Sequence, residues 1–228
     1  MGPDRLRAAL EGVPDPGWLT EALRRVAAEP ATLPRIFATV GRNCGRGQLP
    51  DAPGWTADDA ARVLLLTALP ADAVAAQVET LYRYGDAAEK RAVLRALPML
   101  PLDAEALPLL HDAIRSNDTR LLTAALGPYA RHLDDAAWRQ AVLKCVFLGV
   151  PLSAVDALAE RADTELAVML AGLADERHAA GRSIPADATA LLDRLTHASV
   201  RPASGPDQSA HGPDQVTHGP ARSTSKEA

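Results

Sequence analysis

Apolar residues recur at helical spacing along most of this 228-residue chain. In stretches such as "ADDAARVLLLTAL" they fall three and four positions apart, which places them on one face of a helix. The remaining short apolar runs are rich in Ala and Leu rather than β-branched residues, and none alternates as a strand would. The pattern predicts helices near residues 4–11, 17–28, 32–42, 57–69, 72–84, 86–97, 103–116, 118–126, 134–148, 153–160, 163–180 and 185–197.

Prolines and capping residues mark the same boundaries. Proline suits a first helical turn, where its missing N–H has no partner to lose. Prolines stand between the periodic segments or at first turns at Pro70, Pro98, Pro101, Pro128, Pro151 and Pro185. Side chains able to cap the helix that follows are Thr56, Asp103, Asn117, Asp134 and Ser153. Gly149 and Gly181 suit helix ends.

Three related segments point to stacked helix pairs. "LLTALP" begins at Leu65, "VLRALP" at Val93 and "LLTAAL" at Leu121, so the spacing is 28 residues twice. Each period would hold two short antiparallel helices. We therefore expect an all-α fold of antiparallel helical hairpins, stacked as an irregular, HEAT-like α-solenoid or as an orthogonal bundle, in a single domain over residues 1–198.

The chain changes character after this region. Residues 199–228 contain almost no bulky apolar side chain and include the duplicated heptapeptides GPDQSAH and GPDQVTH. Such a segment buries too little surface to offset the entropy lost on ordering. We expect a disordered tail, and a neutral duplication explains its two repeated histidines more simply than a metal site does.

Composition narrows the function classes. The chain is 47% hydrophobic but only 4% aromatic, so the core must consist mainly of Ala, Leu and Val. A net charge of −5 argues against broad nucleic-acid binding, which needs a basic face. The two cysteines lie in no metal-ligand spacing, so neither a metal nor another cofactor is predicted. No apolar run is long enough to span a bilayer, and we expect a cytoplasmic protein.

No motif predicts a catalytic residue. The chain lacks phosphate-loop, nucleophile-elbow and zinc-protease patterns, and its histidines are scattered. The paired acids Asp58/Asp59 and Asp134/Asp135 fall in first turns of predicted helices. There, carboxylates favour the helix dipole, so a capping role is favoured over general acid–base chemistry.

Polar residues on apolar helices are the remaining candidates. In "AAWRQAVLKCVFLG", Gln140 and Lys144 share one face. They either form a narrow solvated stripe, with the lysine amine reaching water, or line a pocket in which Lys144 would attract an anion. Arg95, Arg115 and Asn117 lie in similarly mixed segments, where surface salt bridges are the alternative explanation.

Several segments together resemble the EboA family. They are "RVLLLTALP", "AVLRALPMLP", the Arg–x–Asn of "IRSND", "DDAAWRQAVLKCVFLGVPL" and "ELAVMLAGLADERHAAGR", and they cover roughly residues 55–182. The resemblance implies a metabolite-traffic protein from a bacterial secondary-metabolite cluster. Encoded partners would include a membrane prenyltransferase, a TatD-like hydrolase and sugar-isomerase-like proteins. The resemblance carries over no catalytic residue, and it leads us to expect a glutamate near Thr123, which this chain lacks.

Two main hypotheses follow, beside a third in which the protein is a purely structural scaffold that depends on its partners and the tail is a passive linker. The first is a non-enzymatic binding or adaptor protein, with a helical groove for partner proteins or for a small polar or prenylated metabolite. The alternative is an enzyme in which Lys144 acts as a cation or a Schiff-base nucleophile. The candidate ligand-binding residues are Lys144, Gln140, Arg95, Arg115, Asn117, Trp138 and Arg177. Convergence of Arg95, Asn117, Gln140 and Lys144 on one cavity would favour a ligand site.

Overall fold

The computed structural model describes residues 1–200, with side chains up to residue 197, and this part of the chain is helical. Its α-helices are α1 (Pro3–Ala9), α2 (Pro16–Ala28), α3 (Leu33–Asn43), α4 (Ala57–Thr67), α5 (Ala71–Tyr84), α6 (Ala87–Ala96), α7 (Leu107–Arg115), α8 (Thr119–Ala125), α9 (Asp135–Leu148), α10 (Leu158–Arg161), α11 (Thr164–Ala179) and α12 (Ala186–Val200). The only pairing of β type within residues 1–200 is an isolated bridge between Gln48 and Thr56. The all-α prediction is confirmed.

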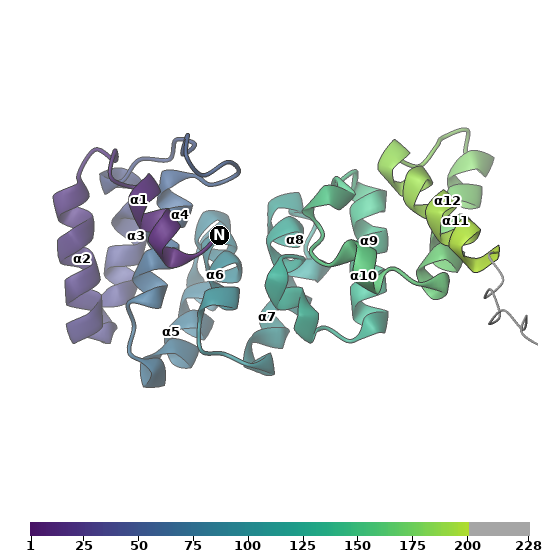
Figure 1. Ribbon diagram of the computed structural model, residues 1–228. Helices are drawn as coiled ribbons and strands as arrows, with labels where there is room; N and C mark the ends of the chain where they lie inside the picture. Colours follow the sequence, from purple (N-terminus) through teal and green to yellow (C-terminus); the bar gives the residue numbers. More distant parts are fainter. Residues whose placement is uncertain (201–228) are drawn as a thin grey trace, which may run out of the picture.

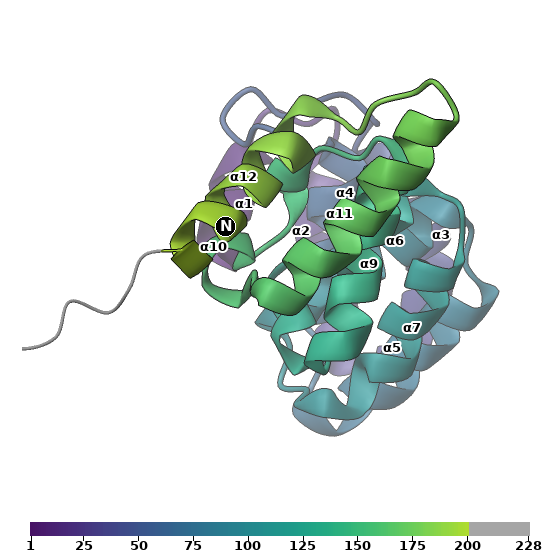
Figure 2. The ribbon, with the colours of Figure 1, turned by 90° about the vertical axis from the view of Figure 1, so that its right-hand side faces the viewer.

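The helices are stacked side by side along the molecule (Figure 1). One row of helices runs in the order of the chain. In it α4 packs against α6, α6 against α8, α8 against α9 and α9 against α11. Helices α3, α5 and α7 flank this row, and α12 packs on α11 at one end (Figure 2). The three segments related by 28 residues lie on α4, α6 and α8, which are consecutive in the row.

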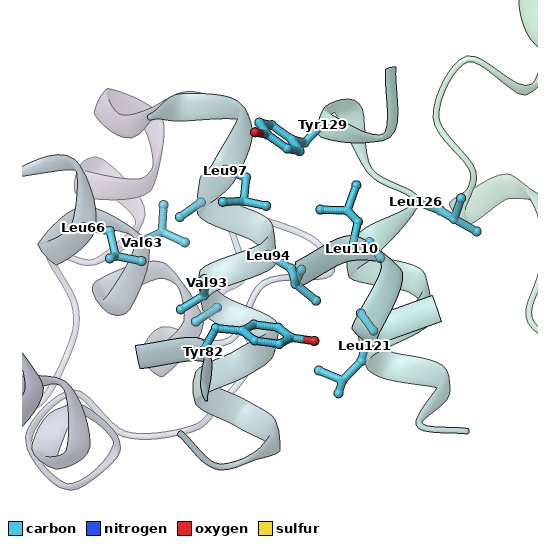
Figure 3. Packing of buried hydrophobic residues seen from close by; sticks show 14 of the residues in the cluster. Val63, Leu66, Tyr82, Val93, Leu94, Leu97, Leu110, Leu121, Leu126 and Tyr129 are labelled. Carbon is cyan, nitrogen blue, oxygen red and sulfur yellow. The ribbon is translucent and has the colours of Figure 1, made fainter. Parts of the chain in front are cut away.

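The core between these helices is mainly aliphatic, with a few aromatic rings such as those of Tyr82 and Tyr129 (Figure 3). Leucine, valine and alanine side chains make up most of it, and one buried cluster extends from Leu6 to Leu191. Burying each large aliphatic side chain contributes roughly 1.5–3 kcal/mol. This continuity supports the proposal of a single domain over residues 1–198. The tail expected over 199–228 lies outside the described residues, except that α12 includes 199 and 200.

Helix ends agree with the sequence at some positions. Asp134 caps α9 by accepting a 2.7 Å hydrogen bond from the N–H of Ala137, and Gly149 ends that helix in the left-handed conformation. Three other capping predictions were wrong, among them that of Asp103, which makes no side-chain capping hydrogen bond. Asp118, rather than Asn117, caps α8, and Ser153 falls within a 3-10 turn because the helix expected at 153–160 is reduced to α10.

Capping was also the wrong interpretation of the first turn of α4. The Thr56 hydroxyl donates to the Asp58 carboxylate rather than accepting from a backbone N–H. Asp58 forms a 2.7 Å ion pair with Arg62, and both side chains are buried. Arg62 also donates to the carbonyl of Phe37 at 3.3 Å, which joins α4 to α3. A buried charge needs such a partner because it has lost its water.

Removing one partner of this pair should destabilise the fold. Asp58→Ala leaves the Arg62 guanidinium buried without a counter-charge, and we expect it to lower the free energy of unfolding by about 3–5 kcal/mol. The matched control is Glu79→Ala, which breaks an exposed pair with Arg83 and should cost less than about 1 kcal/mol. Urea unfolding followed by circular dichroism gives both values, and equal losses would contradict the account.

The two cysteines should be unreactive in the native protein. Both are buried and unpaired. Burial raises the pKa of Cys44 to about 11 and that of Cys145 to about 12. Because the thiolate is the reactive form, Ellman's reagent at about pH 8 should modify neither thiol quickly. Unfolding in urea should expose both to rapid reaction, whereas a fast-reacting thiol in the native protein would contradict this burial.

Candidate functional site

A cavity of about 530 Å³ lies where α4, α6 and α8 meet. We call it the arginine cavity, because its charged side chains are Arg91, Arg95 and Arg120 together with a single carboxylate, Asp59. Its other lining residues are Met1, Gln48, Gly54, Trp55, Thr56, Leu94, Pro98, Met99, Thr119, Thr123, Ala124, Gly127 and Pro128. Cavities of this size are typical of small-molecule sites.

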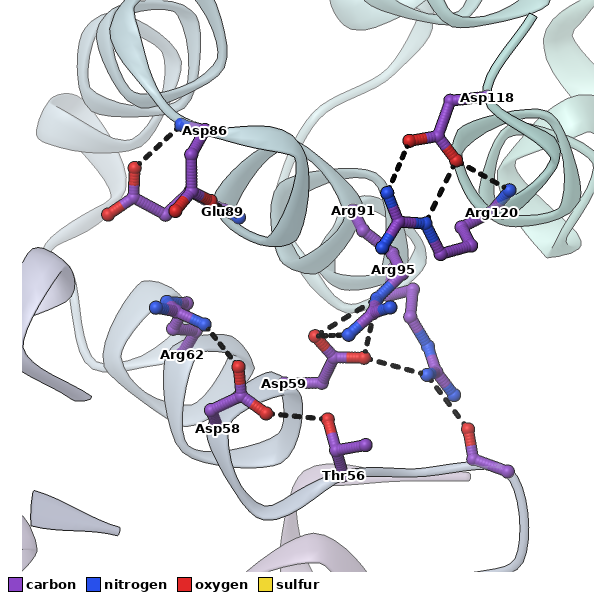
Figure 4. Close-up of polar contacts among 11 residues, drawn as sticks. Thr56, Asp58, Asp59, Arg62, Asp86, Glu89, Arg91, Arg95, Asp118 and Arg120 are labelled. Atoms are coloured by element: carbon purple, nitrogen blue, oxygen red, sulfur yellow. Dashed lines mark hydrogen bonds and ion pairs between the residues drawn. The ribbon is translucent and has the colours of Figure 1, made fainter. Parts of the chain in front are cut away.

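Asp59 holds two of the arginines in place (Figure 4). Its side chain is only 1% exposed, and its nearest contact with Arg91 is 2.9 Å. Arg95 approaches the same carboxylate at 3.1 Å and also donates to the carbonyl of Gly54 at 2.9 Å. Asp59 lies in the first turn of α4, and Arg95 lies in the last turn of α6. These positions also favour each charge in its helix dipole.

Trp55 fixes the plane of the Arg95 guanidinium. The guanidinium carbon lies 3.5 Å from the centre of the indole ring, which is a stacked cation–π contact. Burial lowers the pKa of Arg95, and the neighbouring Asp59 carboxylate opposes that shift. Arginine remains protonated in proteins, so Arg95 is a fixed positive charge at the cavity.

The α8 side of the cavity is polar but less charged. Arg120 pairs with Asp118 at 2.7 Å. Thr119 and Thr123 are exposed here, and Thr123 is the position near which the resemblance led us to expect a glutamate. Leu94 and the partly buried Pro98, Met99 and Ala124 supply apolar surface. The cavity therefore combines fixed positive charge with an apolar wall.

A larger groove, of about 700 Å³, lies between α5 and α7. We call it the α5–α7 groove. Tyr82 donates a 3.1 Å hydrogen bond to Asp112 within it. Its charged side chains balance, with Glu79, Glu105 and Asp112 against Arg83, Lys90 and Arg115. Its ion pairs Arg83–Glu79 and Arg115–Asp112 are more than half exposed to solvent. Such pairs contribute little binding energy, so size alone does not make this groove the better site.

The predicted site residues do not converge. Arg95 lines the arginine cavity, and Arg115 lines the α5–α7 groove. Asn117 and Gln140 are exposed, and neither lines these two cavities or the shallower recess between α10 and α12. Of the four residues whose convergence would have favoured one ligand site, only Arg95 lies in the arginine cavity. Whether the others contact a ligand stays a prediction.

Lys144 reaches from α9 to the end of α7. Its amine donates to the carbonyls of Ile114 at 2.6 Å and Ser116 at 2.7 Å. The last carbonyls of a helix have no partner within the helix, and a cation there also complements the dipole. The sequence left open whether Lys144 reaches solvent or lines a pocket. In the structure its amine instead caps the end of a neighbouring helix.

Trp138 and Arg177 also make helix-to-helix contacts. Trp138 is fully buried, with the Arg161 guanidinium 4.8 Å from its ring centre. Arg177 of α11 donates to the carbonyl of Phe147 on α9 at 2.7 Å and lies over that ring. These contacts attach the last helices to the stack.

The other charged side chains of the arginine cavity were not predicted from the sequence as site residues, and Asp59 was interpreted as a capping acid. Arg91 and Arg95 are four residues apart on α6, which is a visible signal that they share one face. Asp59 gave no comparable signal, because its burial depends on how α4 and α6 pack. Among the described residues, no group of three or more His, Cys, Asp or Glu side chains is arranged to hold a metal ion.

Comparison with known protein families gives a match over most of the described chain. Residues 24–193 match the family described as "Metabolite traffic protein EboA". No curated protein and no solved structure matches the chain significantly. The matched range includes every helix from α3 to α11, and therefore the α4, α6 and α8 walls of the arginine cavity. Because the match covers well over half of the sequence, the chain belongs to the EboA family.

Proposed function

We propose that this protein binds a small metabolite without covalent chemistry, in the arginine cavity, and releases it unchanged. The observation that carries the proposal is the cavity itself, where positive charge fixed by buried Asp59 lies beside an apolar wall. Membership of a family of metabolite-traffic proteins supports the same function. Prealigned side chains reduce the entropy lost when a ligand binds.

The charged groups of the cavity suit binding better than catalysis. Arginine does not lose its proton at physiological pH, so it cannot serve as a general base. Asp59 already accepts from two guanidiniums, and its carboxylate is almost fully covered. General acid–base catalysis requires a group that can exchange a proton with the substrate. The arrangement of charges therefore supports binding of a metabolite rather than its chemical conversion.

The remaining expectations concern the setting of the protein. A cytoplasmic location stays a prediction from the lack of a long apolar run in the sequence. A secondary-metabolite cluster in a bacterium, and contacts with its prenyltransferase, TatD-like hydrolase or sugar-isomerase-like proteins, stay predictions from the resemblance. Among residues 1–200, no helix is long and apolar enough to cross a membrane. An adaptor role is compatible with metabolite binding, since a carrier must also meet the proteins that load and unload it.

Blocking the cavity should abolish metabolite binding. The neutral fluorophore N-phenyl-1-naphthylamine is a suitable probe, because its emission rises in an apolar site. Thr119 is exposed and lines the cavity, so Thr119→Trp should fill space without disturbing the core. We expect the affinity for the probe to fall by at least about tenfold, equivalent to about 1.4 kcal/mol.

The matched control places the same side chain in the other large cavity. Ala76 is exposed and lines the α5–α7 groove, and Ala76→Trp should leave probe affinity unchanged. Circular dichroism would verify that both variants fold. If only Ala76→Trp weakens binding, the ligand lies in the α5–α7 groove and the proposed site is wrong.

The Lys144 alternative has its own test. Lys144→Met keeps the aliphatic stem but leaves the carbonyls of Ile114 and Ser116 without their donor. We expect it to lower the free energy of unfolding by about 1–3 kcal/mol and to leave probe binding intact. Gln140→Ala, at an exposed position of the same helix, should change neither. Preferential labelling of Lys144 by propanal and borohydride in the folded protein, located by peptide mass spectrometry, would instead favour the enzyme.

A further inference from the structure

The side-chain charges at the arginine cavity do not cancel. Arg120 is neutralised by Asp118, with which it forms two side-chain hydrogen bonds. Arg91 and Arg95 share Asp59, so two positive charges face one negative charge. The cavity lining contains no second carboxylate to balance them. The side chains therefore leave one unit of positive charge at the cavity.

Guanidinium donors are also left over. Among the described contacts, the hydrogen bonds of Arg95 all come from Nη1, and those of Arg91 come from Nε and Nη2. Both arginine side chains remain about one-fifth exposed. The planar guanidinium matches the two oxygens of a carboxylate, and such pairs form strong hydrogen bonds. The stack on Trp55 holds Arg95 in one plane before any ligand arrives.

The wall beside these donors is apolar. Leu94 lies between the two arginines on α6, Pro98 and Met99 follow them in the turn at its end, and Ala124 lines the cavity from α8. A ligand whose acid group met Arg91 and Arg95 would place the rest of its body against these side chains. Burying a hydrocarbon or aromatic body there would remove apolar surface from water and so add to the affinity.

We propose that the arginine cavity selects an amphiphilic organic acid, with one negatively charged head group and an apolar body, over neutral or cationic compounds of the same shape. This inference rests on the proposed function, since it names the ligand class of the same site. The head group binds the free donors of Arg91 and Arg95 and neutralises the charge left by their single counter-ion. The apolar body supplies the remaining affinity.

Thr123 offers a test that changes only the charge. It is exposed on α8 and lines the cavity. Thr123→Glu adds a carboxylate that competes with the ligand for the two arginines, and Thr123→Gln adds a neutral side chain of the same size. The added negative charge also offsets the positive charge that attracts the acid. We therefore expect at least about a tenfold loss of acid binding from Glu and little change from Gln.

The probes are octanoate, 1-octanol, octylammonium and inorganic phosphate, each titrated calorimetrically into the full chain. Octanoate should bind at one site, at least about tenfold more tightly than the other three probes. Only Thr123→Glu should remove that preference. Equal binding of octanol would overturn the acid preference while leaving the cavity as a binding site. Phosphate binding as tight as that of octanoate would contradict the proposal that the ligand needs an apolar body.

Two further results would overturn the inference. Octanoate binding that is equal in Thr123→Glu and Thr123→Gln would place the acid elsewhere on the protein. Failure of octanoate to bind at all would contradict the proposal that the ligand is an amphiphilic organic acid. The neutral fluorophore would still report separately on whether the cavity binds small molecules, so the two proposals fail independently.

Discussion

A carboxylate enclosed by packed helices must be matched by positive charge, and Asp59 is matched by two arginines rather than one. Removed from water, its charge would be costly without partners. The partners come from α6, so the interaction fixes the position of α6 against α4. It also immobilises Arg91 and Arg95 at the edge of a cavity. Stability of the stack and preparation of the site therefore depend on the same contact.

The helical stack is predictable because its causes are local. Apolar spacing, prolines at first turns and a left-handed Gly149 locate helices to within a few residues, with the region 153–160 as an exception. Asp134 caps as expected, since a cap concerns only the next turn of chain. The burial of Asp59 could not be predicted from such local signals. It depends on arginines 32 and 36 residues away, and first-turn acids usually serve their own helix.

The candidate site residues also divide into features that local sequence predicts and features that only packing determines. Arg95 was identified because an arginine within an apolar helix needs an explanation, and it lies at the arginine cavity. Lys144 required an explanation for the same reason, but its amine caps the end of α7. Spacing reveals that a charged group is enclosed, whereas only packing decides whether its partner is a carbonyl, a carboxylate or a ligand. Within the "DDAAWRQAVLKCVFLG" segment, Lys144 thus joins α9 to α7, whereas Asp134 caps α9 itself and Gln140 is exposed.

Nuclear magnetic resonance of the indole N–H groups can show whether a small amphiphile enters the arginine cavity. The chain has three tryptophans: Trp55 lines the cavity, Trp138 is in the core, and Trp18 lies on α2. As octanoate is titrated into the ¹⁵N-labelled full chain, the account predicts a saturable shift of the Trp55 signal alone. An unchanged Trp55 signal, or an equal shift of all three, would contradict it.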